Sequence, residues 1–182
     1  HPAMWELRDA DTRILFIGSV HALPADLDWQ DARVRAAVRD ADELVLELSP
    51  REIVSASAVF NAMAADDPVP PLLERLPRDR AEQLIDLLKQ ARIDESDADH
   101  MESWALALAA GNVLSSDAGI SADNGVEDRL VGAFSAAHKP ISGLETARGQ
   151  LSIFDRLSAA QQTSMLIKQL ADAGDNQRQT EY

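Results

Sequence analysis

Two short apolar segments separated by a helical pattern constrain the fold more than any other feature. Residues 12–18 form a mostly apolar run, and residues 43–48 form a second run that ends before Ser49-Pro50. Between them, residues 30–41 place alanine and valine at near-helical spacing. This order predicts a βαβ unit whose two strands are parallel neighbours or near-neighbours, joined by a right-handed crossover. The sequence therefore indicates an α/β fold.

An N-terminal β-hairpin is expected ahead of this unit. Residues 4–8 alternate in character, residues 9–11 read as a turn, and residues 12–18 would form the second strand. The apolar character of that strand predicts burial on both of its faces. Residues 139–145 form a further short strand and its exit. Together these segments predict a small mixed sheet, made of the hairpin plus parallel strands with helical crossovers.

Helical patterns fill most of the remaining chain. A group of three, over residues 51–65, 79–91 and 97–110, is interpreted as a helical insert at about 51–111 that covers one side or rim of the sheet. Further helices are expected over 124–138, 148–157 and 158–173. Because 182 residues suit one domain with an insert, we expect a single domain over residues 1–182.

Composition removes several classes of function. The chain has no cysteine, which excludes disulfides, thiolate zinc sites, iron–sulfur clusters and a cysteine nucleophile. Its formal net charge of −14 disfavours binding to nucleic acid and to anionic membrane surfaces. No stretch of about 18 apolar residues occurs, so membrane insertion is not expected. No signal peptide is recognised at the start of the sequence.

Three ionisable residues fall where predicted strands end. His21 follows the first apolar strand, Glu47 lies near the end of the second, and Glu145 ends the third. In open sheets with helical crossovers, ligands bind beyond the carboxyl ends of the strands. We therefore expect one imidazole and two carboxylates to converge on one rim. Such a set suits a metal ion, or a water molecule activated by a base that a carboxylate holds.

Each of these residues also has a structural interpretation. His21 could cap a loop, and Glu145 could cap the helix that begins near Thr146. Glu47 would lie in a buried strand. An unpaired charge there would destabilise the fold by roughly several kcal/mol, because it loses its solvation. It must then have a partner such as an arginine, or lie at an open rim.

Two further positions, Glu127 and Ser19, carry weaker functional signals. Glu127 follows Asn124 by three residues, the spacing of a capping box, which favours a structural role at a helix start. Ser19 lies close to His21 and suggests a nucleophile, but no G-x-S-x-G elbow surrounds it.

Several segments, in the same order along the chain, resemble the TraB/GumN family. They are Pro2 to Leu7, Leu15 to Pro24 with its G-x-x-H motif at 18–21, Ala41 to Leu48, Gly125 to Glu127, and Lys139 to Thr146 with its G-L-E-T motif at 143–146. The resemblance implies an α/β fold related to erythromycin-esterase-like and ChaN-like proteins. It also implies kinship to the Tiki proteases, which are metal-dependent peptidases that use G-x-x-H histidines and a glutamate.

The resemblance assigns roles to the same three residues. His21 matches the first G-x-x-H histidine, Glu47 the glutamate of the second strand, and Glu145 the G-L-E-T glutamate. We therefore expect a metal-dependent hydrolase of a peptide or a small ester, with His21, Glu47 and Glu145 as catalytic residues and metal ligands. The metal expected from the resemblance is Mn, Co or Zn. Export with removal of a leader, to the periplasm, is the compartment that the family suggests.

The sequence departs from the family pattern in one respect. Family members usually continue further and carry a second G-x-x-H histidine, whereas this chain ends at Tyr182 without one. We expect either a fragment or a divergent short form. In a fragment, an uncovered sheet edge could pair with another copy and form a homo-oligomer. The alternative function is a non-catalytic module that binds or sequesters a peptide or haem.

Overall fold

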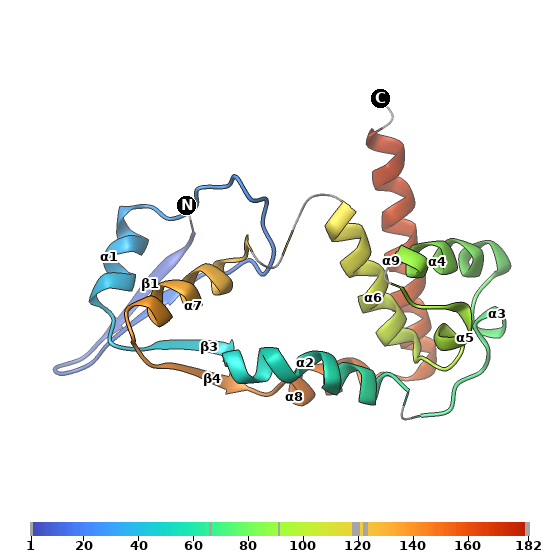
Figure 1. Cartoon of the computed structure of the whole chain (residues 1–182), viewed down its shortest axis with the longest axis horizontal. Coiled ribbons are helices and arrows are strands. Elements are labelled where there is room, and N and C mark those ends of the chain that lie inside the picture. Colours follow the sequence, from blue (N-terminus) through green and yellow to red (C-terminus); the bar gives the residue numbers. More distant parts are fainter. Residues whose placement is uncertain (1, 66, 91, 118–120, 122–123, 181–182) are drawn as a thin grey trace. The chain divides into compact units, whose positions relative to one another are not determined.

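The computed structural model describes residues 2–180, apart from residues 66, 91, 118–120 and 122–123. Within these residues the chain divides into two compact units, which are drawn in Figure 1. The strand unit comprises His1–Pro50 and Gly119–Leu144, and the helical unit comprises Arg51–Ala118 and Glu145–Tyr182. The predicted insert at 51–111 falls in the helical unit. The mixed α/β class is confirmed, with an antiparallel hairpin and a parallel strand pair.

The N-terminal hairpin has the predicted order. Strand β1 (Met4–Arg8) pairs antiparallel with β2 (Arg13–Ile17). The turn between them is closed by Asp9, whose Oδ1 accepts hydrogen bonds from the backbone N–H groups of Asp11 (3.2 Å) and Thr12 (2.8 Å). Aspartate is favoured in turns because its carboxylate can bind the backbone of following residues in this way. These hydrogen bonds hold the pKa of Asp9 below its usual value.

The prediction that the second strand is buried on both faces was wrong. Phe16 is 52% exposed and Ile14 is 43% exposed, and they lie opposite the exposed residues Trp5 and Leu7 of β1. These four large side chains share one face of the hairpin, which we call the outer hairpin face. On the other face, Met4 and Ile17 pack against the core of the unit. A two-stranded sheet with one covered face leaves its second set of apolar residues exposed, because side chains alternate between the faces.

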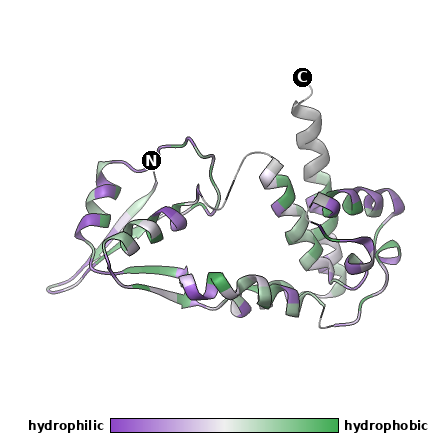
Figure 2. Cartoon of the chain, viewed as in Figure 1, coloured by the Kyte–Doolittle hydropathy of each residue, from purple (hydrophilic) through white to green (hydrophobic). Residues whose placement is uncertain are grey.

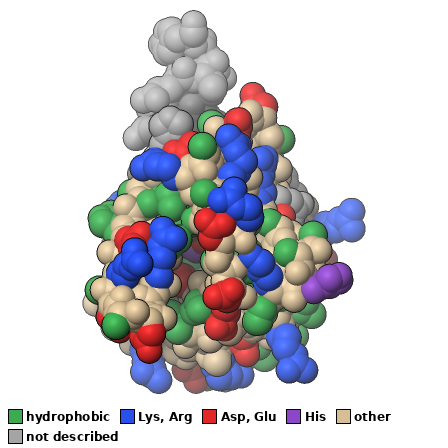
Figure 3. Space-filling model, turned by 90° about the vertical axis from the view of Figure 1, so that its left-hand side faces the viewer, with side chains coloured by type: hydrophobic (Ala, Val, Ile, Leu, Met, Phe, Trp, Pro, Cys, Tyr) green, Lys and Arg blue, Asp and Glu red, His purple; other side chains and the backbone are tan. Residues whose placement is uncertain are grey.

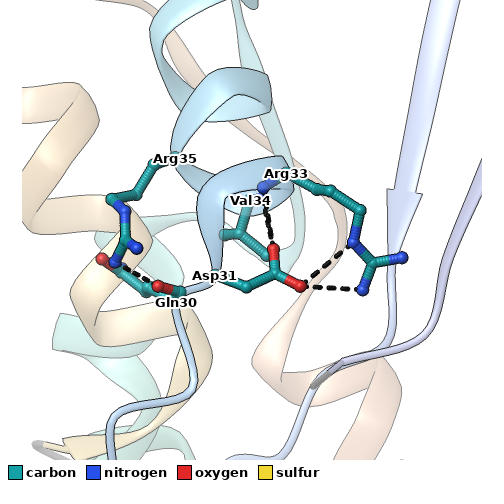
Figure 4. Close-up of polar contacts among 5 residues, drawn as sticks. All are labelled: Gln30, Asp31, Arg33, Val34 and Arg35. Carbon is teal, nitrogen blue, oxygen red and sulfur yellow. Dashed lines mark hydrogen bonds and ion pairs between the residues drawn. The ribbon is translucent and has the colours of Figure 1, made fainter.

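Helix α1 (Ala32–Asp40) is closed at both ends by side chains. At its start, Asp31 Oδ1 accepts hydrogen bonds from the backbone N–H groups of Arg33 (2.9 Å) and Val34 (3.0 Å), as Figure 4 shows. This is the usual way in which an aspartate satisfies the free N–H groups of a helix start. Beyond its end, Lys139 Nζ donates to the carbonyl oxygens of Arg39 (2.7 Å) and Ala41 (2.6 Å). A cation at this position is favourable because helix carbonyls point toward it.

Strand β3 (Leu44–Leu48) pairs in parallel with β4 (Ile141–Glu145). The parallel partner of residues 44–48 is therefore β4, and not the hairpin strand expected from the βαβ pattern. In the described part of the chain, β2 and β3 lie in separate two-stranded sheets. Gly143 permits the close pairing of β3 and β4, because a Cβ atom there would lie 2.4 Å from the backbone nitrogen of Ser49.

One hydrophobic cluster fills the strand unit. Its buried members are Trp29, Val34 of α1, and Val126 and Leu130 of helix α7 (Val126–Ala136). Helix α1 thus packs against α7 by the apolar side that the amphipathic pattern of residues 30–41 indicates.

The face turned to the viewer in Figure 3 mixes acidic and basic side chains, and shows no continuous acidic patch despite the net charge of −14.

The helical unit is built around α4 (Arg78–Gln90), α6 (Ser103–Asp117) and α9 (Ala159–Thr180), which lie side by side in Figure 1. Around them are α2 (Pro50–Met63), α3 (Leu72–Arg75), α5 (Glu95–Ala98) and α8 (Ala147–Asp155). Leu84, Leu106 and Leu166 are fully buried in the shared core. Figure 2 shows both hydrophilic and hydrophobic residues along α4, as expected for a helix with one buried face. None of the described helices has the length and apolar character needed to span a membrane.

The single helix expected over residues 97–110 is instead two helices, α5 and α6. The chain leaves the helical path between them, where tertiary hydrogen bonds replace helical ones. Asp99 Oδ1 accepts a hydrogen bond from the backbone N–H of Leu72 (2.8 Å), and the backbone N–H of Glu102 donates to the carbonyl of Ala64 (2.8 Å). The Arg75 guanidinium donates to the carbonyl of Met101 (2.7 Å). The contacts of Leu72 and Arg75 depend on α3, a short helix that the sequence pattern did not indicate.

Glu102 is a buried carboxylate of the helical unit, with 4% of its surface exposed. Its Oε2 accepts a hydrogen bond from Gln162 Nε2 (2.9 Å), whereas Oε1 has no hydrogen-bond partner among the described residues. Burial raises the pKa of Glu102 above its usual value, because the charged form loses solvation. The neighbouring Trp104 is fully buried and stacks on Phe154 with 6.5 Å between ring centroids.

Candidate functional site

The candidate site lies in the strand unit, where the chain leaves β2 and passes the start of α7. The loop after β2 is fixed there by backbone hydrogen bonds on both sides of His21. The N–H of Val126 donates to the carbonyl of Val20 (3.1 Å), and Leu23 forms an antiparallel bridge with Ser121. Arg129 Nη2 adds a hydrogen bond to the carbonyl of Ala25 (3.2 Å). The position of His21 is therefore set by the loop backbone as well as by its own side chain.

Glu127, in the first turn of α7, joins two side chains of this loop. Its Oε1 accepts a hydrogen bond from Ser19 Oγ and lies 2.9 Å from His21 Nδ1, within ion-pair distance. The His21 side chain is 75% exposed, whereas that of Glu127 is 23% exposed. A carboxylate is favoured in the first turn of a helix, where the backbone N–H groups carry partial positive charge. The structure thus brings Ser19, His21 and Glu127 together.

The other oxygen of Glu127 is in a different environment. Oε2 is buried and has no hydrogen-bond partner in the described part of the chain. Ser19 and His21 therefore both contact the same oxygen, Oε1. This arrangement restrains the orientation of the carboxylate, because rotation would break the hydrogen bond to Ser19 and the contact with His21 together.

The capping-box interpretation of Glu127 was wrong. The residue that precedes α7 is Gly125, and no side chain caps this helix start. The Glu127 carboxylate is bound by Ser19 and His21 instead. The spacing from Asn124 to Glu127 therefore gave the wrong partner, because a short-range pattern does not show which distant loop lies over a helix start.

One ring nitrogen of His21 remains available. Nδ1 is bound by Glu127, and Nε2 has no hydrogen bond in the described part of the chain. When the imidazole is neutral, an Nδ1–H that donates to a carboxylate leaves the lone pair on Nε2. That lone pair can accept a proton or bind a metal ion. Ser19 Oγ is bound to Glu127, not to the imidazole, so the structure shows no serine–histidine hydrogen bond of the kind that activates a nucleophile.

Glu47 lies in the strand unit, but not in the environment expected from the sequence. It is exposed on β3, where Leu46 is buried and Leu44 and Leu48 are half-buried on the opposite side. The expectation of a charge inside a buried strand was therefore wrong. Glu47 also has a polar or electrostatic partner, so its carboxylate is not unpaired. The cause is again a two-stranded sheet that is covered on one side only.

Glu145 is the last residue of β4 and is exposed. It belongs to the helical unit, whereas His21 and Glu47 belong to the strand unit, so the convergence of the three residues stays a prediction. The interpretation of Glu145 as a helix cap was wrong. Thr146 is the N-cap of α8, with its Oγ1 accepting a hydrogen bond from Gly149 N (3.1 Å).

Among the described residues, no three His, Cys, Asp or Glu side chains lie close enough together to hold a metal ion. The described residues therefore offer a paired imidazole, but not a complete set of three ligands of the kind that catalytic zinc sites have.

The sequence matches the model of the TraB/PrgY/gumN family over residues 3–181. The chain belongs to the TraB/PrgY/gumN family. Residues 18–21, which carry His21, and residues 125–127, which carry Glu127, both lie in the matched region. The resemblance carried by the G-x-x-H and G-L-E-T motifs is thereby confirmed.

Two relatives have the same printed name, "Uncharacterized protein YbaP", one from Escherichia coli K12 and one from Shigella flexneri. Each is 23% identical over 141 residues, which cover 78% of this chain and 51% of the relative. The chain therefore spans about half the length of the curated relatives that it matches. No solved structure matches the chain.

Proposed function

We propose that the chain belongs to a metal-dependent hydrolase that cleaves peptide or ester bonds, with His21 as its functional imidazole. The observation that carries this proposal is the environment of His21. Its ring is largely exposed, Nδ1 lies 2.9 Å from Glu127 Oε1, and Nε2 makes no hydrogen bond with the described residues. Ligating and proton-accepting histidines are commonly oriented by a carboxylate on the second nitrogen in this way.

The residues fit a bound metal in part. His21 Nε2 would supply one ligand, and Glu47 and Glu145 are the carboxylate ligands that the sequence predicts. Mn, Co or Zn would lower the pKa of a bound water molecule and so supply a nucleophile near neutral pH. The part that the described residues play is more limited: Glu127 orients His21, and His21 Nε2 binds the metal or accepts the proton of water.

A hydrolysis assay with His21→Ala tests this function. Libraries of peptides and small esters are incubated with the protein, with and without a chelator, and the wild type is compared with the variant. We expect turnover that the chelator abolishes, and loss of turnover in His21→Ala with unchanged thermal unfolding. The matched control is His100→Ala, because His100 is also exposed and also has its Nδ1 engaged, by the carbonyl of Ser96 at 2.7 Å.

Two results would contradict the proposal. Turnover that is equal in the wild type and in His21→Ala would remove His21 from the reaction. A wild type that hydrolyses nothing in either library, with or without added Mn²⁺, Co²⁺ or Zn²⁺, would contradict hydrolysis itself. A variant that fails to fold would favour the structural interpretation of His21.

A second candidate is a non-catalytic module that binds an apolar peptide. The observation in its favour is the outer hairpin face, on which Trp5 is 62% exposed and Leu7 is 61% exposed. An exposed apolar patch of this kind is typical of an interaction surface. This function predicts peptide binding that Phe16→Asp weakens and His21→Ala leaves unchanged. Binding that depends on His21 instead would contradict it.

A further inference from the structure

We propose that Glu127 is a positioning residue that holds His21 in the Nδ1–H form and so reserves Nε2 for the reaction. This inference rests on the proposed function and adds a residue to that site. The carboxylate of Glu127 is not itself placed to meet a substrate, since Oε1 contacts Ser19 and His21 and Oε2 is buried. It therefore acts through His21.

The geometry supports this role in three ways. First, a carboxylate oxygen of Glu127 lies 2.9 Å from Nδ1, and because a carboxylate can accept but not donate, a proton on Nδ1 is favoured over a lone pair facing the negative charge. Second, Ser19 Oγ donates to the same oxygen and restrains the carboxylate from rotating away from His21. Third, the carbonyl of Val20, next to His21, is bound by the first residue of α7, and Leu23 is bound to Ser121 ahead of that helix, so the imidazole and the carboxylate approach each other as parts of one local structure.

The strand unit contains a matched pair that lacks the histidine. Ser142 Oγ donates to Glu43 Oε1 at 2.6 Å, which resembles the hydrogen bond between Ser19 and Glu127. Glu43 and Ser142 thus provide a serine–glutamate contact in the same unit with no imidazole attached. A substitution at Glu43 removes an equivalent hydrogen bond and leaves the surroundings of His21 unchanged.

The test is the position of the imidazole proton, measured by two-bond ¹H–¹⁵N NMR on the full chain with labelled histidine. The His21 signals are assigned by their loss in His21→Ala, and spectra are recorded at a pH where the ring is neutral. We expect the Nδ1–H form in the wild type and in Glu43→Ala, and a shift toward the Nε2–H form in Glu127→Ala. If Glu127→Ala does not fold, Glu127→Gln serves as the second variant. Its amide oxygen can still accept a hydrogen bond, so His21 should retain the Nδ1–H form.

A second readout uses Zn²⁺ alone as the probe. Loss of the carboxylate that orients a ligating histidine typically lowers metal affinity or activity by about 10- to 100-fold. We expect a loss of this size in Glu127→Ala, a smaller loss in Ser19→Ala, and none in Glu43→Ala. If turnover is measurable, kcat should fall more than KM rises, because the substituted residue does not touch substrate.

The outcomes separate this inference from the proposed function. An Nε2–H form of His21 in the wild type, or an unchanged tautomer in Glu127→Ala, overturns the role of Glu127 even if the protein is a hydrolase. The expected tautomers without any turnover support the positioning of His21 and contradict only the hydrolase.

Discussion

The two units of the chain differ in how fully they bury their large apolar residues. In the helical unit, Leu84, Leu106 and Leu166 are fully buried in one core. In the strand unit, the buried cluster around Trp29 is smaller, and Trp5 and Phe16, which lie opposite each other on β1 and β2, are both mostly exposed. Backbone fit at Gly143 and the side-chain hydrogen bonds of Asp31 and Lys139 also hold this unit together. Burial thus stabilises one unit more, and local geometry the other.

The largest expected effect is loss of a core side chain in the helical unit. Leu166→Ala should lower the free energy of unfolding by about 2–5 kcal/mol, because it leaves a cavity between α9 and its neighbours. The measurement is chemical denaturation followed by circular dichroism. A loss below about 1 kcal/mol would show that this core is loosely packed, and would weaken the contrast between the units.

Gly143→Ala tests the backbone fit of the strand unit. The new Cβ would lie 2.4 Å from the Ser49 nitrogen, so β3 and β4 must separate locally. We expect a loss of about 1–3 kcal/mol, the usual range for overpacking, in the same denaturation experiment. Gly132→Ala is the matched control, because a Cβ there meets nothing within 4 Å. Equal stability of Gly143→Ala and Gly132→Ala would contradict the close pairing.

Glu102→Gln tests the one buried carboxylate singled out in the helical unit. Because burial raises its pKa in the folded state above the ordinary value of 4.5, the folded protein binds the proton more tightly than the unfolded chain does. Its stability contribution is therefore lost as the pH rises through the window above 4.5. We expect Glu102→Gln to gain about 1 kcal/mol at neutral pH and progressively less toward pH 4.5.

The exposed Glu82 provides the comparison for Glu102. Glu82→Gln should change the free energy of unfolding by less than about 1 kcal/mol, because its carboxylate pairs with Arg78 at the surface. Denaturation at several pH values measures both variants. A gain in Glu102→Gln that is independent of pH would contradict the role assigned to the buried charge.

The smallest effect is expected on the outer hairpin face. Leu7→Ala should change the free energy of unfolding by less than about 0.5 kcal/mol, because Leu7 is 61% exposed. The substitution is chemically the same as Leu166→Ala, so the pair compares the two units directly. A loss of several kcal/mol would show that this face is covered in solution, by another copy or another part of the protein.

The sequence predicted the kind of each main element better than its surroundings. The helices near 32–40, 50–63 and 78–90 were predicted because their apolar residues recur with helical spacing. The break between α5 and α6 was missed, because it depends on Asp99 and Arg75 contacting residues far along the chain. The β1–β2 hairpin was predicted, but the partner of β3 was missed for the same reason. β3 pairs with β4, about a hundred residues away in sequence.

For the candidate site, the sequence identified His21 but not its partner. The G-x-x-H motif and the position after a strand both indicated His21. Glu127 was assigned to helix capping, because the spacing from Asn124 was the only local signal. The contact between Glu127 and His21 joins a helix start to a loop about a hundred residues earlier in the chain. A single sequence has no local pattern that indicates such a contact.

The most direct test of the account is to follow His21 by two-bond ¹H–¹⁵N NMR while Zn²⁺ is added to the full chain. The account predicts that the Nε2 signal of His21 changes on binding, whereas Nδ1 keeps its proton beside the Glu127 carboxylate. Metal binding through Nδ1, or a His21 ring that does not respond to Zn²⁺, would contradict it.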